Sequence, residues 1–238
     1  MPTTEVSREG NCHMTIQKTL KLADAVASIS DGSVVMIGGF MAVGTPPRLI
    51  DEIVRQGKRD LTVICNDTAR PGVGIGKLID AGLVRRLIVS HIGTNPETQK
   101  RMISGAIEVE LVPQGTLAER IRSGGYGLGG ILTPTGLGTV VEKGKQIIEV
   151  DGRPFLLEKA LKADVALIYA RQADYLGNLT YALTARNFNP LMAMAANLVI
   201  AEAREIVPVG VIPPDSVMTP AVLVDCLVLK ESSWTKNS

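Results

Sequence analysis

Three glycines stand between a short apolar run and a pair of prolines early in the sequence. Gly38 and Gly39 directly follow residues 34–37, and Gly44 precedes Pro46-Pro47. Glycines between a strand and a helix leave backbone N–H groups free to face an anion or a carbonyl oxygen. The same spacing also suits a tight turn without a ligand, and the spacing alone favours neither interpretation.

Two amides and one histidine follow other apolar runs. Gln114 comes after Pro113, where a side-chain amide can donate an N–H to a carbonyl oxygen that gains negative charge. Asn66 ends its run in the same way, and either amide could instead bond across its own loop. His91 could act as a general base, but no acid partner is identifiable. A loop histidine bonded to the backbone is the simpler interpretation of His91.

The elements that must position these residues alternate along the first half of the chain. Short runs rich in β-branched residues predict strands at residues 34–37, 61–65, 87–90 and 109–112. Amphipathic segments predict helices at residues 16–29 and 47–57, up to residue 81, around 101–104, and up to residue 122. Strands alternating with helices predict a three-layer α/β fold, with a mostly parallel sheet covered by helices on both faces.

The second half departs from this rhythm before resuming it. Residues 124–138 contain seven glycines and predict a long irregular loop. Asp151-Gly152 predicts a tight turn in a β-hairpin that spans residues 145–157. The last predicted elements are strands at 165–169, 198–201 and 221–228, with a helix at 190–196. We therefore expect one domain at residues 14–230, with the glycine-rich loop and the hairpin as an insertion.

Four polar loops should meet at one edge of this sheet. They are residues 38–45, 66–76, 91–96 and 113–116. Ligands of open α/β sheets bind beyond the carboxyl ends of the strands. Any one of these loops could be ordinary turn chemistry, but the four together favour a small-molecule site.

Composition excludes several classes of protein. The formal net charge is +1, and no stretch combines basic residues with aromatics, so nucleic-acid binding has no electrostatic support. The sequence has three scattered cysteines and two histidines, a composition that argues against a zinc site or a disulfide framework. Such cysteine usage suits a reducing cytoplasm. The sequence contains no run of about 20 apolar residues, so a transmembrane helix is not expected. Residues 1–13 lack a signal-peptide pattern and are interpreted as an extension, and residues 231–238 as a tail.

Two nucleotide-binding patterns fail on context. Gly125, Gly127 and Gly130 have GxGxxG spacing, but they follow a predicted helix and not a strand. A Walker A match ending at Lys77 would need glycine at position 71 and serine or threonine at position 78, where Pro71 and Leu78 stand.

Several segments together resemble the acetate/acetoacetate-type (3-oxoacid) CoA-transferase family. The first is residues 31–46, DGSVVMIGGFMAVGTP. The others are residues 66–69 (NDTA), 91–98 (HIGTNPET), 112–122 (VPQGTLAERIR), 133–136 (TPTG), 177–181 (GNLTY) and 185–190 (ARNFNP). The likeness runs from about residue 15 to about residue 228 without a large gap, and such coverage makes it specific.

The resemblance implies a ping-pong transfer of coenzyme A between short carboxylic acids. In this family a glutamate carboxylate attacks the acyl-CoA thioester, and a glutamyl-CoA thioester forms on the enzyme. That glutamate belongs to a Ser-Glu-Asn-Gly signature in the beta subunit, which this sequence does not contain. Its glutamates at 97, 108, 110 and 119 do not match the context of the nucleophile. The chain is thus expected to be an alpha subunit, paired with a beta subunit as α2β2, with coenzyme A thioester as substrate and no permanently bound cofactor or metal.

The resemblance also assigns residues. Gln114 matches the glutamine that helps to hold the thioester oxyanion, and Asn66 matches an asparagine near the same site. The loop that the family uses around coenzyme A corresponds to Gly38, Gly39, Phe40, Met41, Ala42, Val43 and Gly44.

The hypotheses differ in substrate and in class. Residues 66–69 and 91–98 resemble the acetate/butyrate–acetoacetate type more than the 3-oxoadipate type. The alternative is the alpha subunit of a 3-oxoadipate or succinyl-CoA:3-oxoacid CoA-transferase. A small-molecule-sensing α/β domain is the alternative of another class, although such regulators need a helix-turn-helix and a basic face. A self-sufficient isomerase or hydrolase would need its own acid/base pair, and none stands out.

Overall fold

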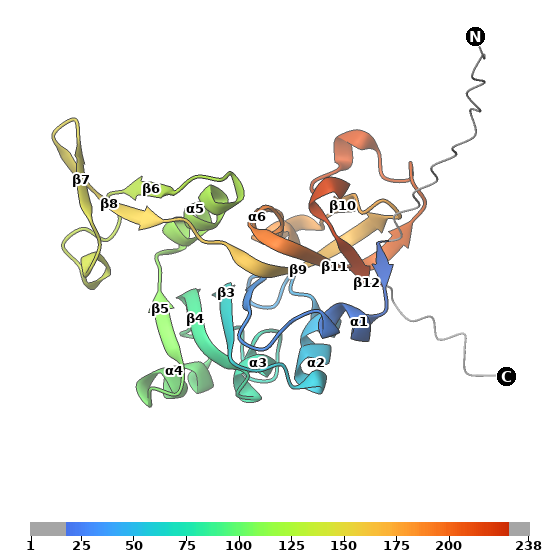
Figure 1. Cartoon of the computed structure of the whole chain (residues 1–238), viewed down its shortest axis with the longest axis horizontal. Helices are drawn as coiled ribbons and strands as arrows, with labels where there is room; N and C mark the ends of the chain where they lie inside the picture. The colour runs from blue at the N-terminus through green and yellow to red at the C-terminus, as the bar shows by residue number, and fades with distance from the viewer. Residues whose placement is uncertain (1–17, 229–238) are drawn as a thin grey trace, which may run out of the picture.

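The computed structural model describes residues 18–228. The predicted extension at 1–13 and the predicted tail at 231–238 lie outside the described residues. Figure 1 shows a central sheet with helices on both sides and a small separate sheet at one end.

The central sheet is mostly parallel, as the strand–helix alternation predicts. Its strands lie in the order β1-β12-β11-β9-β2-β3-β4-β5, and short β10 pairs antiparallel with β9. The strands are β1 Thr19–Leu20, β2 Val34–Ile37, β3 Leu61–Asp67, β4 Val84–His91, β5 Glu108–Leu111, β9 Ala163–Asp174, β10 Leu179–Thr180, β11 Ala196–Val207 and β12 Cys226–Val228. The strands that carry the predicted site, β2 to β5, are consecutive neighbours in space.

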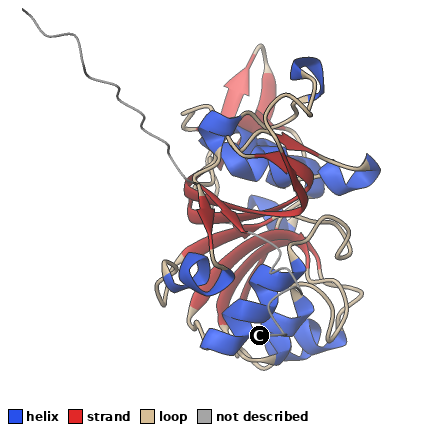
Figure 2. Cartoon of the chain, turned by 90° about the vertical axis from the view of Figure 1, so that its right-hand side faces the viewer, coloured by secondary structure: helices blue, strands red, loops and turns tan. Residues whose placement is uncertain are grey.

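Two apolar clusters cover the two faces of this sheet, so the predicted three layers are confirmed (Figure 2). Val35 and Ile37 of β2 belong to one cluster and Met36 to the other, because successive side chains of a strand point to opposite faces. The helices are α1 Leu22–Ala27, α2 Pro47–Gln56, α3 Gly76–Asp80, α4 Pro96–Ile103, α5 Gln114–Gly125 and α6 Asn189–Met194. The buried apolar side chains of α1 to α3 belong to the first cluster, and those of α5 and α6 belong to the second.

A three-stranded antiparallel sheet lies beyond α5. Its order is β6-β8-β7, with β6 Gly130–Thr133, β7 Ile147–Val150 and β8 Arg153–Lys159. Asp151 and Gly152 have φ values of 50° and 71°, which confirms the predicted tight turn of the hairpin. The irregular loop predicted for residues 124–138 is wrong at Gly124 and Gly125, which end α5, and at β6. A Cβ at Gly130 would lie 2.4 Å from the carbonyl oxygen of Glu158, so this glycine permits close strand pairing.

Two other predicted elements differ from the structure. The helix predicted for 16–29 is shorter, because Thr19 and Leu20 pair with β12 as a strand before α1 begins. The strand predicted for 221–228 is limited to β12. It is preceded by a 3-10 turn, Ala221–Leu223, whose first N–H donates to Asn178 Oδ1 at 2.9 Å.

Candidate active site

A cavity of about 450 Å³ opens at the carboxyl ends of β2 to β5. Its lining residues are Phe40, Met41, Asn66, Asp67, Ser90, His91, Thr94 and Gln114. They come from all four of the predicted loops or from the strand ends that precede them. The convergence predicted from the sequence is therefore present in the structure.

The loop after β2 forms a two-residue turn over this cavity. Phe40 and Val43 exchange two backbone hydrogen bonds, of 3.0 Å and 2.9 Å. Met41 and Ala42 between them have φ values of 50° and 70°. Positive φ at both central residues is the pattern of a type I′ turn, which glycine, asparagine and aspartate usually occupy. Side chains at these positions strain the backbone, so the surroundings must hold the turn.

Asp67, the last residue of β3, anchors the turn of residues 40–43 through a hydrogen bond to its backbone. Its Oδ2 atom accepts the N–H of Met41 at 2.8 Å and an Asn66 amide N–H at 2.8 Å. Its Oδ1 atom accepts the N–H of Ala69 at 2.7 Å. Asp67 is 4% exposed. A buried carboxylate with three donors is a fixed structural anchor.

Two asparagines before and within α6 hold the other side of the loop. Asn187 Oδ1 accepts the N–H of Gly39 at 3.0 Å, and Asn187 Nδ2 donates to Val43 O at 2.9 Å. Asn189 Nδ2 donates to Gly44 O at 3.0 Å. A Cβ at Gly38 would lie 1.9 Å from Asn189 Oδ1. These contacts belong to the chain itself, so part of the glycine pattern is explained by packing.

Ser90 connects the two predicted amides. Its hydroxyl donates to Asn66 O at 2.7 Å and lies 3.5 Å from Gln114 Oε1. Asn66 is 1% exposed, whereas Gln114 is exposed and is the first residue of α5. With its Oε1 atom turned toward Ser90, Gln114 keeps its amide N–H groups for a ligand. The positive end of the α5 dipole lies at the same place.

His91 lines the cavity, directly beside Asp67 in the β3–β4 register. Within residues 18–228 its ring has no hydrogen bond, so neither an acid partner nor the expected backbone partner is present there. Arg186, at the end of a 3-10 turn, is exposed and does not line this cavity.

The predicted loop residues divide between two hollows. Phe40 and Met41 line the cavity with Gln114. Ala42 and Gly44 line a neighbouring hollow of about 420 Å³, and Val43 is 50% exposed. Gly38 and Gly39 are buried beneath the turn. The turn of residues 40–43 therefore separates two spaces.

Three residues of the cavity were not singled out from the sequence. They are Asp67, Ser90 and Thr94, whose hydroxyl donates to Ala69 O at 2.8 Å. Their residue types are common in loops, and only their places at the ends of neighbouring strands signal a role. Position after an apolar run was the one signal that could have found Asp67 and Ser90.

Whether the cavity has a carboxylate nucleophile of its own depends on the acidic side chains that line it. Among the residues that line it, Asp67 is the only carboxylate, and both of its oxygens are occupied. The other glutamates considered from the sequence form ion pairs elsewhere: Glu97 with Arg101, Glu108 with Arg86, Glu110 with Arg86 and Arg120, and Glu119 with Arg122. The cavity thus offers hydrogen-bond donors without a free carboxylate nucleophile of its own.

Cys65 lies just before these residues on β3. Complete burial, and then the charge of Asp67, raise the pKa of its thiol well above the usual value. The thiol therefore stays protonated and is a core side chain, not a nucleophile. Between residues 18 and 228, no cluster of three or more histidine, cysteine, aspartate or glutamate side chains could hold a metal ion. No helix in that part of the chain is long and apolar enough to cross a membrane.

A family model described as Coenzyme A transferase matches residues 19–230. The chain belongs to the coenzyme A transferase family. The fold and the resemblance predicted from the sequence are thereby confirmed, and an enzyme is favoured over a sensing domain.

Three known proteins illustrate the likeness. The chain is 55% identical to a protein named acetate CoA-transferase subunit alpha from Escherichia coli K12, over 91% of this chain and 98% of that protein. It is 50% identical to the acetoacetyl-CoA:acetate/butyrate CoA transferase alpha subunit of Clostridium acetobutylicum, over 89% of this chain and 97% of that protein. The fold matches an acyl-CoA transferase from E. coli O157:H7 with a TM-score of 0.80 at 24% identity, covering 89% of this chain and 47% of that chain.

Proposed function

We propose that this chain is the alpha subunit of a transferase that moves coenzyme A between short carboxylic acids, with acetate and acetoacetate as the substrate pair. The names of the 55% and 50% identical relatives support this choice of acids. Each relative is matched over nearly its whole length, so the likeness is not limited to one motif. We also propose that the enzyme acts in the cytoplasm without a permanently bound cofactor.

The observation that carries the proposal is the cavity with oriented amides and no free carboxylate. The transfer needs a carboxylate nucleophile, and Asp67 is fully engaged in holding the loop. A glutamate from a beta subunit that lies over the cavity would supply what is missing. This requirement agrees with the "alpha" in the names of both relatives.

The proposed reaction has two half-reactions. The glutamate carboxylate of the beta subunit attacks the thioester carbonyl carbon, and the C–S bond breaks. CoA departs as the thiolate, and an acyl-glutamyl anhydride remains on the enzyme. The thiolate then attacks the glutamyl carbonyl carbon, and the first carboxylate is released. A glutamyl-CoA thioester remains on the enzyme. The second carboxylic acid takes the coenzyme by the reverse steps.

Gln114 acts on the oxygen that becomes negative in these steps. Its exposed amide at the start of α5 donates an N–H to the thioester oxygen as the tetrahedral intermediate forms. Ser90, whose hydroxyl donates to Asn66 O at 2.7 Å, lies 3.5 Å from Gln114 Oε1 and places the two predicted amides beside each other.

Intact-mass spectrometry tests the division of labour. The co-expressed alpha and beta chains are incubated with acetoacetyl-CoA and then denatured without thiol reagents. The proposal expects the mass of coenzyme A to be added to the beta chain and not to this chain. An adduct on this chain would overturn the proposal that the nucleophile comes from the partner.

A further inference from the structure

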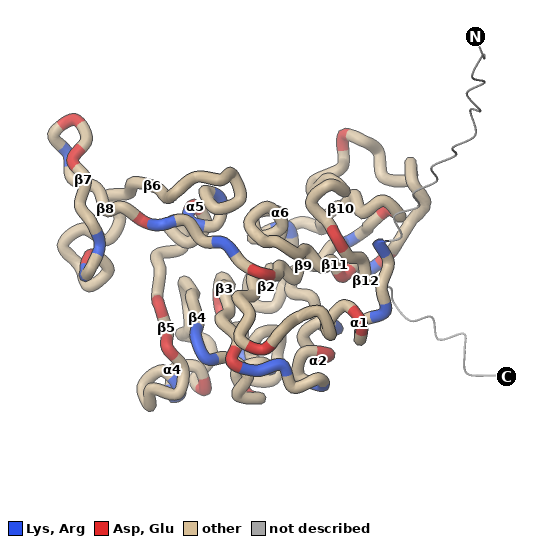
Figure 3. The backbone as a smooth tube through the Cα atoms, viewed as in Figure 1, with Lys and Arg blue, Asp and Glu red and all other residues tan. Residues whose placement is uncertain are grey.

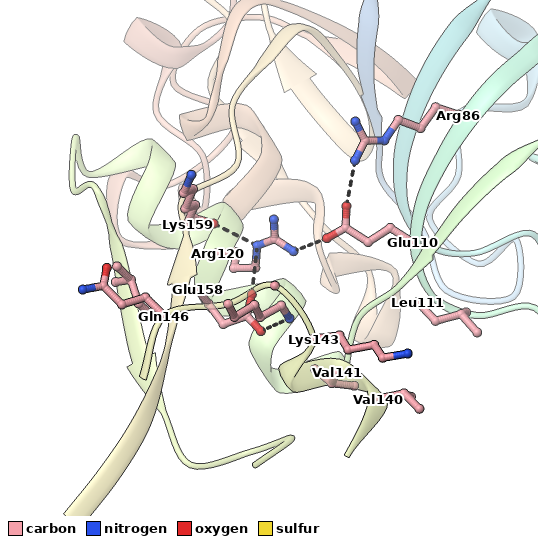
Figure 4. Close-up of a pocket in the computed structure, with 13 residues that line it drawn as sticks. Arg86, Glu110, Leu111, Arg120, Val140, Val141, Lys143, Gln146, Glu158 and Lys159 are labelled. Carbon is pink, nitrogen blue, oxygen red and sulfur yellow. Dashed lines mark hydrogen bonds and ion pairs between the residues drawn. The ribbon is translucent and has the colours of Figure 1, made fainter. Parts of the chain in front are cut away.

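A further hollow, of about 710 Å³ and separate from the two described above, lies between the main sheet and the small antiparallel sheet (Figure 4). It is lined by residues of β4, β5, α5 and β8 and by the segment 140–146. Its volume falls within the range of small-molecule sites. None of its lining residues lines the cavity that contains Gln114.

Positive charge is concentrated in this hollow. Five cationic side chains line it, against two carboxylates, an excess of three charges. The cations are Arg86, Arg120, Lys143, Lys145 and Lys159, and the carboxylates are Glu110 and Glu158. The whole chain has a net charge of +1, and Figure 3 shows both basic and acidic positions along it, so the excess is a local feature. A third carboxylate, Glu108, pairs with Arg86 from outside the lining.

Both carboxylates of the lining are already engaged. Glu110 accepts from Arg120 Nη1 at 2.7 Å and from Arg86 Nη2 at 3.0 Å. These arginines outweigh the effect of burial and lower the pKa of Glu110. Glu158 is 1% exposed, accepts from Lys145, and lies 3.8 Å from Arg120 Nε. The two acids therefore hold three of the five cations in place: Arg86, Arg120 and Lys145.

Several donors remain free to meet a ligand. Arg120 is 7% exposed, and within residues 18–228 its Nη2 atom has no partner. Lys159 contacts Arg120 only through its backbone carbonyl, and its ammonium group has no partner in the described part of the chain. The same holds for the ammonium group of Lys143. Figure 4 shows both lysine termini without a contact.

Apolar side chains share the rim with these cations. Leu111 is 49% exposed and Val140 is 84% exposed, and Val141 also lines the hollow. Exposed apolar surface beside a cluster of cations suits a ligand with a flat organic part and several negative charges. Lysine binds phosphate as a point charge, and arginine adds directed N–H groups.

We propose that this hollow binds a phosphorylated anion of nucleotide size. With Glu108 counted, five cations face three carboxylates, and the excess of two charges is more than a single carboxylate can neutralise. A nucleotide with two or more phosphate groups supplies enough negative charge. The ligand could be the nucleotide end of coenzyme A, which rests on the proposed function, or a separate phosphorylated effector. Arg120 lies six residues after Gln114 on α5, about 9 Å along the helix axis.

Calorimetry with adenosine 3′,5′-bisphosphate tests the site on the co-expressed complex. The Lys143→Ala/Lys159→Ala variant removes two exposed side chains that make no hydrogen bond or ion pair within residues 18–228, so its fold should be preserved. We expect Kd to rise about tenfold or more in this variant. The matched control, Lys21→Ala/Lys100→Ala, removes the same charge at exposed positions elsewhere and should leave Kd unchanged. Equal Kd values in both variants, or no binding by the unmodified complex, would overturn the proposal.

Kinetics then distinguish the two sources of the ligand. If the hollow takes the nucleotide end of coenzyme A, the lysine variant raises KM for acetoacetyl-CoA and not for acetoacetyl-pantetheine, which lacks the nucleotide. If it takes a separate effector, both KM values stay unchanged while binding of the bisphosphate is lost. A complex that binds the bisphosphate but transfers no coenzyme A would contradict the proposed function and leave this site standing.

Discussion

The carboxylate of Asp67 accepts the backbone N–H of Met41 at 2.8 Å and thereby joins the end of β3 to the turn that follows β2. Met41 and its neighbour Ala42 both have positive φ, and this conformation costs of order 1–3 kcal/mol for each residue that is not glycine. The turn persists because Asp67 on one side and Asn187 on the other bond its backbone. One buried acid thus shapes the loop and leaves the nucleophile to be supplied from elsewhere.

Asp67→Asn is expected to loosen the turn. An amide has one acceptor oxygen. With that oxygen in the place of Oδ2, the NH2 group faces the N–H of Ala69, so one of the three present contacts is replaced by two opposed donors. The free energy of unfolding should fall by about 1–3 kcal/mol, and KM for acyl-CoA should rise. Urea unfolding and steady-state kinetics of the co-expressed complex measure both effects. Asp60→Asn, at an exposed aspartate, is the matched control and should match the unmodified protein. An unchanged midpoint for Asp67→Asn would contradict its role as an anchor.

Gln114→Ala is expected to lower kcat by roughly tenfold to a thousandfold, the scale for the loss of one oxyanion donor. The fold should be unaffected because Gln114 is exposed. Gln114→Glu keeps the shape but replaces the donor by a carboxylate, so it should be at least as slow. Gln172→Ala, on β9, serves as the control with full activity. A normal rate for Gln114→Ala would remove this residue from the site.

Gly38→Ala is expected to destabilise the chain by about 1–3 kcal/mol. The added Cβ would lie 1.9 Å from Asn189 Oδ1, an atom that accepts the N–H of Tyr169 at 3.0 Å. Gly129→Ala is the matched control, since a Cβ there meets no atom within 4 Å. Thermal unfolding of both variants compares them. If the two Tm values fall equally, close packing is not the reason for glycine at position 38.

Glu52 should make stability depend on acid pH. Hydrogen bonds from Arg55, and then from Gln56, lower the pKa of Glu52 from 4.5 to about 2. Because the folded pKa is below the unfolded value, the contribution is complete above about pH 4.5 and is lost as the pH falls toward 2. Its partner Arg55 is exposed, which limits the contribution to about 1 kcal/mol or less.

Urea unfolding of Glu52→Gln across this pH range measures the effect. The variant should be less stable than the unmodified chain at pH 6 and should approach it as the pH nears 2. A difference that stays constant with pH would show that ionisation of Glu52 is not its source.

The sequence predicted the sheet better than its borders. Residues 34–37 form a strand within their predicted limits because an unbroken apolar run, rich in β-branched residues, is buried on both faces of the sheet. β9 and β11 extend beyond the predicted residues because each pairs with the other over nearly its full length. β6 was missed because its identity comes from pairing with β8 and not from local pattern.

The site shows the same limit. Gln114 and Asn66 were found because they follow apolar runs and match a family motif. The roles of Asp67 and Ser90 depend on contacts across neighbouring strands, such as the 2.7 Å bond from Ser90 to Asn66 O, and no local pattern encodes those contacts. The glycines at 38, 39 and 44 could not be assigned to packing until Asn189, Thr45 and Ala185 were placed beside them.

The most direct test of the central claim is transfer of coenzyme A from acetoacetyl-CoA to acetate. The assay compares this chain alone, a beta subunit with the Ser-Glu-Asn-Gly signature alone, and the two together. Activity is expected in the mixture only, because the amides of this chain and the carboxylate of its partner are both required. Clear activity from this chain alone would contradict it and would mean that a glutamate of this chain performs the chemistry.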